Sequence, residues 1–297
     1  PEPLGADTAG SRYLDPDGSF PNHIPNPENE AAMQSILDAV QESKADLGII
    51  FDTDVDRAGA VLSDGTELNR NRIIAMMAAI LLREHPGTTI VTDSITSTGL
   101  AAFIRKHGGV HHRFKRGYRN VINESMRLNR EGHDSQLAME TSGHGALKEN
   151  YFLDDGAYLV TRLLIELARA KKEGYTLESL IADLAEPAES KEFRMNILVP
   201  DFKAYGQKII DELNVYAASQ PGWSVAPDNF EGVRVNLDKA HGDGWFLLRL
   251  SLHDPLIPLN IESDSVGGVR QIAAELAPFL RPFDQLDTSA LLAFAGC

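Results

Sequence analysis

An apolar run that ends abruptly in alternating acids is the feature that most constrains this chain. Residues 47–61 read LGIIFDTDVDRAGAV, with Asp52, Asp54 and Asp56 at every second position and Arg57 directly after them. The segment LGIIF is typical of a buried strand that stops at a polar turn. Carboxylates this close repel one another unless a cation lies between them, and oxygen ligands suit Mg²⁺ or Ca²⁺. The spacing therefore predicts a divalent-cation site at the end of a strand.

Other interpretations of this acidic loop are a solvated turn, an EF-hand and a phosphatase motif. An EF-hand fits poorly, because its sixth position requires glycine and holds Arg57, and its twelfth requires glutamate and holds Ser63. The haloacid-dehalogenase phosphatases carry D-x-D-x-[T/V] after a strand, and FDTDV resembles it, with Asp52 as nucleophile and Asp54 as acid–base. That motif does not require Asp56 or the arginine, whereas an arginine beside a metal can hold a phosphoryl oxygen.

A second polar loop follows another expected strand. SQLAME, residues 135–140, reads as a strand that runs into TSGHGALKEN, and the loop brings Glu140, Ser142 and His144 together. A carboxylate, a hydroxyl and an imidazole can exchange hydrogen bonds with vicinal hydroxyls, and a polar turn with a capping serine is the alternative. Because open α/β sheets place ligands at the carboxyl ends of their strands, we expect this loop and the acidic loop to share one site.

The order of the expected elements indicates an α/β fold followed by a different domain. The first 25 residues are rich in turn-forming types, and Asn26 with Pro27 reads as the start of a helix. Strands expected at 46–51, 88–93 and 135–140 alternate with helices at 72–84, 97–106 and 155–172, which is typical of parallel or mixed sheets. After about residue 185, strands at 192–199, 233–238, 244–252 and 258–263, with helices near 202–218 and 266–280, predict a separate α+β domain.

Composition fits a globular protein and argues against several partners. Apolar residues make up 43% and charged residues 24% of the chain, and no apolar stretch approaches the roughly 20 residues that span a bilayer. The net charge of -15 argues against nucleic acid as the main partner, because phosphate backbones bind basic faces. Cys297 is the only cysteine, which rules out a disulfide framework within the chain and favours an intracellular compartment.

Taken together, these loops resemble those of the α-D-phosphohexomutases, the family of phosphoglucomutase, phosphomannomutase and phosphoglucosamine mutase. The family's metal loop, D-G-D-G-D-R, stands here at 52–57, and its sugar loop, G-E-x-S-G-H, at 139–144 with Met139 in place of the leading glycine. FPNHIPNPE at 20–28 is similar to its F-P-N-H-x-P-x-P segment, and KRGYRNV at 115–121 to its third-domain specificity loop. The amino-acid sequence of these segments is most similar to that of a phosphoglucomutase-like branch of plants and green algae.

The resemblance implies a mixed-sheet architecture of a partial second α/β domain at 1–68, a third at 69–185 and a smaller α+β domain at 186–297. It implies an isomerase that passes a phosphoryl group between a phosphoserine and a hexose phosphate through a bisphosphorylated sugar, which also serves as primer. The Mg²⁺ ligands would be Asp52, Asp54 and Asp56, and the catalytic groups Arg57 and His144. The residues expected to bind the sugar or its phosphate are Glu140, Ser142, Gly117 and Arg119.

Two departures from the family pattern affect this expectation. No segment resembles the serine loop T-A-S-H-N-P, so we expect the chain to begin inside the second domain, to depend on a missing N-terminal domain and to be inactive alone. The phosphate loop, R-P-S-G/N-T-E-P with an arginine beyond it, is altered to RLSLHDPLIP. Arg249 and Ser251 persist as expected phosphate ligands and His253 is a substitute donor, but Pro258 stands where the arginine belongs and lacks an N–H.

Three functions therefore compete. The first is a phosphohexomutase that uses Mg²⁺ and a sugar bisphosphate primer. The second is a non-catalytic descendant that binds sugar phosphates or partner proteins, which the altered loop favours. The third is a phosphatase of the haloacid-dehalogenase type, which would hydrolyse its substrate unaided. The sequence leaves open the hexose, the oligomeric state and the choice between plastid and cytoplasm.

Overall fold

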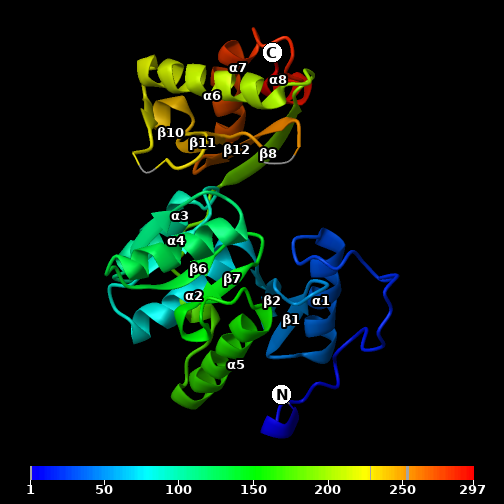
Figure 1. Cartoon of the computed structure of the whole chain (residues 1–297). Helices are drawn as coiled ribbons and strands as arrows, with labels where there is room; N and C mark the ends of the chain where they lie inside the picture. The colour runs from blue at the N-terminus through cyan, green and yellow to red at the C-terminus, as the bar shows by residue number, and fades with distance from the viewer. Residues whose placement is uncertain (1, 228, 252–253) are drawn as a thin grey trace. The chain divides into compact units, whose positions relative to one another are not determined.

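The computed structural model describes residues 2–227, 229–251 and 254–297 of the chain (Figure 1). The chain divides into two compact units, Pro1–Ala185 and Glu186–Cys297. No helix among the described residues combines the length and the apolar character needed to cross a membrane.

The first unit begins with a helix and a small antiparallel sheet. After the 3-10 turn η1 (Glu2–Leu4), helix α1 spans Glu30–Ser43, and strands β1 (Leu47–Phe51), β2 (Ala58–Leu62) and β3 (Glu67–Leu68) pair in that order. The expected helix start at Asn26 and Pro27 is wrong. The side chain of Asn26 accepts from the N–H of Glu28 and closes a turn, while Asn29 caps the helix by accepting from the N–H of Ala32.

The larger sheet of this unit is mixed, as expected, with strand order β5-β4-β6-β7. Strand β4 (Thr89–Thr92) is parallel to β5 (Val110–Arg113) and to β6 (Ser135–Met139), and β7 (Gly145–Leu147) is antiparallel to β6. Strands β5 and β7 were not expected from the sequence. The first, VHHR, has no apolar alternation, and the second is only three residues long.

Helices cover both faces of this sheet, so the unit is an α/β/α sandwich (Figure 1). Helices α2 (Arg70–Glu84), α3 (Thr98–Lys106) and α5 (Gly156–Glu173) share a core with Ile90 of β4 and Leu137 of β6. Helix α4 (Tyr118–Arg130) packs on the opposite face, against the next residue of each strand, Val91 and Ala138. This alternation of neighbouring residues is the period of two that a strand imposes.

Strand β2 fixes the small sheet against the larger one. All five of its residues are buried, and Ala60 and Leu62 belong to the core formed by α2, α3 and α5. Val61 points the other way and packs with Met33 and Val40 of α1. Burying a large aliphatic side chain contributes roughly 1.5–3 kcal/mol, so this packing holds the β1–β2 hairpin firmly. The loop at the tip of that hairpin is the acidic loop.

The second unit is an antiparallel sheet covered by helices on one face (Figure 1). The strand order is β8-β12-β11-β10-β9, and the elements, listed in chain order, are β8 (Glu189–Asn196), α6 (Phe202–Ser219), β9 (Trp223–Val225), β10 (Val233–Leu237), β11 (Gly244–Leu248), β12 (Leu256–Ser263), α7 (Gly268–Leu280) and α8 (Ser289–Ala295). The strand expected over 244–252 ends at Leu248, although the N–H groups of Arg249 and Ser251 still donate to the carbonyls of Pro258 and Leu256; Leu252 lies outside the described residues. The α+β character expected for this part is confirmed.

Candidate active site

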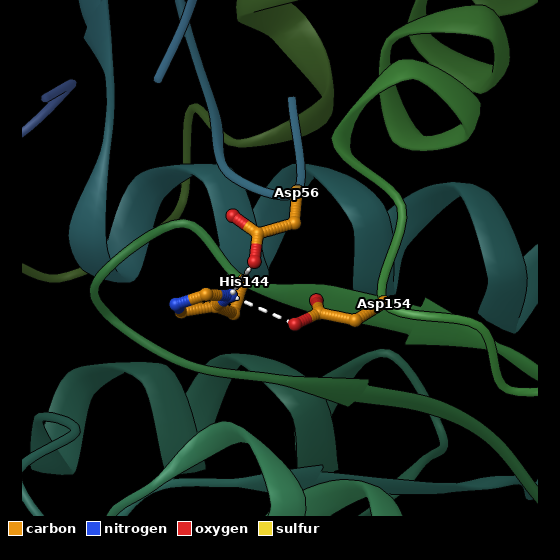
Figure 2. A group of neighbouring side chains, drawn as sticks. All are labelled: Asp56, His144 and Asp154. Carbon is orange, nitrogen blue, oxygen red and sulfur yellow. Dashed lines mark hydrogen bonds and ion pairs between the residues drawn. The ribbon is translucent and has the colours of Figure 1, made fainter. Parts of the chain in front are cut away.

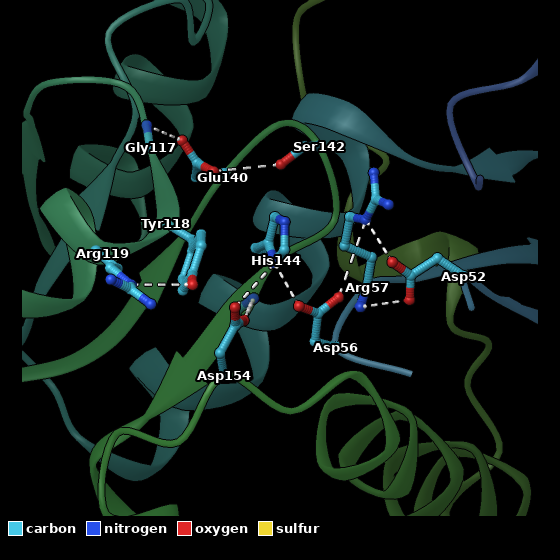
Figure 3. A network of polar contacts seen from close by, with 11 residues as sticks. Asp52, Asp56, Arg57, Gly117, Tyr118, Arg119, Glu140, Ser142, His144 and Asp154 are labelled. Carbon is cyan, nitrogen blue, oxygen red and sulfur yellow. Dashed lines mark hydrogen bonds and ion pairs between the residues drawn. The ribbon is translucent and has the colours of Figure 1, made fainter. Parts of the chain in front are cut away.

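The two polar loops lie side by side in the first unit (Figure 3). The acidic loop is the tip of the β1–β2 hairpin, closed by the N–H of Asp52, which donates to the carbonyl of Arg57 at 3.3 Å. The loop after β6 runs beside it, because Arg57 forms a β-bridge with His144 and the N–H of Ala58 donates to the carbonyl of Gly143. The expectation that both loops share one region is thus met by backbone contacts between them.

Two glycines permit this close approach. Gly143 has φ +99, and a Cβ there would lie 2.8 Å from the carbonyl oxygen of Ala58. Gly156 opens α5 and donates its N–H to the carbonyl of Val55 at 3.0 Å, where a Cβ would lie 2.8 Å from the same oxygen. The acidic loop is therefore held between the loop after β6 and the start of α5.

The acidic loop concentrates carboxylates around one point. Asp52, Asp54 and Asp56 each offer an oxygen, and these oxygens lie within 4.8 Å of one another. Asp52 is buried and accepts from Arg57 twice, from Nε at 2.6 Å and from the backbone N–H at 3.2 Å. Burial alone would raise the pKa of Asp52, but these hydrogen bonds and the charge of Arg57 outweigh it and hold the pKa below its usual value.

Asp56 carries the charge that Arg57 does not neutralise. Burial raises the pKa of Asp56 to about 6, the charge of Asp52 adds to the rise, and the charge of His144 opposes it. Its Oδ1 is buried without a hydrogen-bond partner among the described residues, and Arg57 Nε is 3.9 Å away. An all-oxygen set with surplus negative charge is the donor set that Mg²⁺ prefers, so these residues fit that cation.

Val55 adopts a backbone conformation that is unusual for its type. Its φ is +66, in the left-handed region that disfavours β-branched residues, and it stands at a position where the resembling family has glycine. Its side chain is exposed, and its carbonyl accepts from Gly156. Backbone strain of this kind costs of order 1–3 kcal/mol and persists where surrounding contacts enforce it.

His144 is held by two carboxylates (Figure 2). Its Nδ1 lies 2.8 Å from Oδ2 of Asp154 and 3.6 Å from Oδ2 of Asp56, and its ring stacks on that of Tyr118 with centroids 4.9 Å apart. Burial would lower the pKa of His144, but the hydrogen bond and charge of Asp154, with the charge of Asp56, outweigh it and raise the pKa. Figure 2 shows the other ring nitrogen pointing away from both carboxylates, where it can meet a ligand.

The residues expected to bind sugar come together around Glu140. Its Oε1 accepts from the N–H of Gly117, and its Oε2 lies 3.4 Å from the hydroxyl of Ser142. Burial raises the pKa of Glu140, although the N–H of Gly117 and the charge of Arg116 oppose the rise. Arg119 contacts Tyr118, with Nε 3.0 Å from the phenol oxygen, so it is linked through that ring to His144 (Figure 3).

The expected phosphate ligands belong to the second unit. The N–H of Arg249 donates to the carbonyl of Pro258, and the N–H of Ser251 donates to the carbonyl of Leu256. The hydroxyl of Ser251 accepts from the N–H of Asp254 at 3.3 Å, so it stabilises the turn between β11 and β12. His253 lies outside the described residues.

Two acidic residues near these loops were not predicted from the sequence to belong to the site. Asp93 follows β4 and is fully buried, and it accepts from the hydroxyl of Thr141 at 2.8 Å. Asp154 orients His144, while its neighbour Asp155 caps α5. The sequence carries a signal for each of them. For Asp93, the segment TTIVTD ends an expected strand in an acid, as LGIIFD does. For Asp154, one aspartate suffices to cap the helix, so the aspartate before it has no role in the helix itself.

Two consecutive parts of the first unit match models of one protein family. A family model described as phosphoglucomutase/phosphomannomutase, alpha/beta/alpha domain II, matches residues 7–65, and one described as domain III of the same family matches residues 69–187. The chain therefore belongs to the phosphoglucomutase/phosphomannomutase family.

Individual proteins similar to this chain belong to the same family. A phosphoglucomutase of Neisseria meningitidis is 30% identical over 261 residues, covering 88% of this chain and 53% of that protein. A phosphomannomutase/phosphoglucomutase of Pseudomonas putida is 32% identical over 262 residues, covering 88% and 52%. The crystal structure of a phosphoglucomutase/phosphomannomutase family protein from Burkholderia thailandensis matches with a TM-score of 0.74 at 29% identity, covering 92% of this chain and 55% of that one.

These comparisons confirm the fold expected from the sequence. The chain spans about half the length of the curated relatives it matches. The likeness to a plant and green-algal branch stays a prediction.

Proposed function

We propose that these residues form the metal- and sugar-binding part of a phosphohexomutase, acting on hexose phosphates with a phosphoserine that lies outside the 297 residues. The observation that carries the proposal is the β-bridge between Arg57 and His144. It sets an all-oxygen cation site beside a loop that presents Glu140, Ser142 and an oriented imidazole. Phosphoryl transfer to a sugar hydroxyl requires this juxtaposition of charge stabilisation and substrate positioning.

The acidic loop would stabilise the phosphoryl group. Mg²⁺ bound by Asp52, Asp54 and Asp56 would supply positive charge to the phosphoryl oxygens. Arg57 lies at the edge of the same cluster, with Nε on Asp52, and its guanidinium donors would hold a further phosphoryl oxygen. The carboxylate of Asp52 thereby orients the arginine toward the transferring group.

His144 would move the proton. Because Asp154 accepts at Nδ1, the neutral imidazole presents Nε2 as a base toward the attacking sugar hydroxyl. As that hydroxyl attacks phosphorus, its proton would pass to Nε2, while the bond from phosphorus to the serine oxygen breaks and that oxygen leaves to take up a proton from water. The carboxylates of Asp154 and Asp56 would stabilise the imidazolium. In the reverse half of the cycle the same nitrogen returns the proton to the leaving oxygen.

The sugar would be held by groups on two loops. The carboxylate of Glu140 and the hydroxyl of Ser142 can exchange hydrogen bonds with adjacent sugar hydroxyls. Gly117 and Arg119 would shape the other side of this position.

The direct test is the conversion of glucose 1-phosphate to glucose 6-phosphate with Mg²⁺ and glucose 1,6-bisphosphate as primer. We would assay the full product of the encoding gene, with the 297-residue chain as its control. We expect activity in the gene product, and His144→Gln to lower kcat by about 10²–10⁴, the usual contribution of a general base. A gene product inactive on glucose, mannose and glucosamine phosphates alike would contradict the proposal.

A sugar-phosphate-binding protein without activity is the second candidate. The altered turn at 249–258 supports it, because Pro258 stands where the family pattern has an arginine and has no N–H to donate to a phosphate. Binding of glucose 1-phosphate by calorimetry without turnover in the assay above would favour this candidate. The phosphatase is less well supported, because the side chain of Asp52 is only 1% exposed and both its oxygens accept from Arg57, which leaves a poor nucleophile.

A further inference from the structure

A buried carboxylate with no assigned role lies behind the sugar loop. Asp93 follows β4, the strand between β5 and β6 in the sheet, and is 0% exposed. Its Oδ2 accepts from the hydroxyl of Thr141 at 2.8 Å, and its Oδ1 has no hydrogen-bond partner among the described residues. A buried carboxylate is costly to keep, so its retention calls for a specific role.

The backbone of Asp93 is itself anchored. Its carbonyl accepts from the hydroxyl of Thr96 at 3.0 Å and from that of Thr92 at 3.3 Å. Arg113, at the end of β5, donates from Nε to the carbonyl of Thr96 at 3.2 Å. These bonds join the ends of two neighbouring strands, so Asp93 stands on a rigid support.

Thr141 belongs to the loop after β6 that carries the proposed sugar-binding residues. Its side chain is buried, and it lies between Glu140 and Ser142 in sequence. Two residues further on, the carbonyl of Gly143 is held by the N–H of Ala58. The loop is therefore fixed at two points, and the bond from Thr141 to Asp93 is the one adjacent to the carboxylate of Glu140.

Charge links the same aspartate to the 115–119 loop. The positive charge of Arg116 stabilises the carboxylates of both Asp93 and Glu140. The next residue, Gly117, donates its N–H to Glu140. Asp93 thus acts on one loop through a hydrogen bond and on the other through charge, and Glu140 is the group where the two loops meet.

We propose that Asp93 is a positioning residue that, by anchoring Thr141, holds Glu140 against Gly117 and so aligns the two substrate loops. The coupling rests on contacts within the first unit, and only its description as sugar-binding rests on the proposed function. Asp93 should therefore govern affinity for the sugar rather than phosphoryl transfer itself.

The test is backbone hydrogen exchange on the 297-residue chain. Thr141→Val removes the hydroxyl at nearly constant volume, and Asp93→Leu removes the acceptor. We expect each to speed exchange at the Gly117 amide by roughly tenfold, the factor that one hydrogen bond of ordinary strength represents. Thr141→Ser keeps a hydroxyl and should restore the wild-type rate. The double variant Asp93→Leu/Thr141→Val should exchange no faster than Asp93→Leu alone, because that substitution already removes the acceptor of the Thr141 hydroxyl.

A matched control separates positioning from general destabilisation. Glu166 is a carboxylate equally deep in the same unit, bonded to Tyr175 and Arg83 rather than to either loop. Glu166→Gln should leave the Gly117 amide unchanged. An unaltered Gly117 rate in Thr141→Val, additive effects in the double variant, or the same acceleration in Glu166→Gln would each overturn the proposal.

A second arm keeps this inference distinct from the proposed function. Glucose 1-phosphate is titrated into the chain by calorimetry in the presence of Mg²⁺, and we expect Thr141→Val to weaken binding about tenfold while Thr141→Ser stays within about twofold. If the wild-type chain does not bind this probe, that result counts against the proposed function, and the exchange measurement still decides the role of Asp93. If wild type and Thr141→Val bind it equally, the positioning role is refuted.

Discussion

Nδ1 of His144 and Oδ2 of Asp154 lie 2.8 Å apart, although one residue belongs to the loop after β6 and the other precedes α5. The second oxygen of Asp154 accepts from the N–H of Gly145 at 3.1 Å, and Ala146 forms a β-bridge with Asp154. The carboxylate is therefore fixed by backbone on two sides and in turn fixes the tautomer and direction of the imidazole.

Asp154→Asn should lower the pKa of His144. The raised pKa in the folded protein means that the ion pair stabilises the fold fully below the usual histidine value and is lost as pH rises through the raised value. Removing the charge should cost about 1–3 kcal/mol of unfolding free energy at pH 6, measured by urea denaturation, with the pKa followed by NMR. Asp155→Asn is the control, because asparagine also caps a helix and should leave His144 unchanged.

Asp52→Asn should weaken Mg²⁺ binding by roughly tenfold or more, because ligand charge sets affinity in oxygen sites. The measurement is calorimetry with Mg²⁺, or the rise in melting temperature that Mg²⁺ produces. Asp64→Asn changes an exposed acid in the turn between β2 and β3, at the other end of β2, and should have no effect. Equal losses in both variants would mean that the cation responds only to net charge.

Val55→Gly should raise the unfolding free energy by about 1 kcal/mol. The substitution relieves the strain at φ +66, and this relief exceeds the extra entropy of glycine in the unfolded chain. Val55→Ala keeps a Cβ and removes only the branching, so its gain should be smaller. The midpoints of denaturant unfolding measure these differences in unfolding free energy. A less stable Val55→Gly protein would contradict the prediction and show that the side-chain contacts of the loop outweigh its backbone strain.

Asp93→Asn should remove a pH dependence of stability. Burial, with the charge of Glu140 adding to it, raises the pKa of Asp93 from 3.8 to about 7. A raised folded pKa means that this group's contribution is fully present below about pH 4 and is lost as pH rises through about 7. The stability of the wild type relative to the variant should therefore fall between pH 4 and pH 7, and a constant difference in urea midpoints would contradict the assignment.

The elements that the sequence predicted well are those with strong periodicity and a good cap. Helix α3 begins after Ser97, whose side chain accepts from the N–H of Leu100, and α5 ends at Glu173, one residue beyond the expected end at 172. The start of α1 was misplaced because two asparagines three residues apart both accept from a backbone N–H, and only the second one caps a helix.

The residues of the candidate site could be predicted from the sequence because they lie in continuous motifs directly after expected strands. Asp52 and Glu140 each follow an expected strand directly, and residue type suffices to see that. The strand before Glu140 is buried throughout, whereas the strand before Asp52, expected to be buried, is buried only at Gly48. The positive φ of Val55 could not be predicted from the sequence, since valine is normally a strand residue, and the hydrogen bond that its carbonyl accepts comes from Gly156, far along the chain.

By itself, the sequence determined that strands end near residues 51 and 139 and that carboxylates follow them, because those properties depend on neighbours along the chain. Only the tertiary structure decided that Thr141 meets Asp93, 48 positions away, and that His144 meets Asp56. Those contacts depend on the order β5-β4-β6-β7 and on β2 being buried between α1 and the core shared by α2 and α5. The burial of apolar side chains far from the site selects that arrangement, and the polar residues at the strand ends are carried into contact by it.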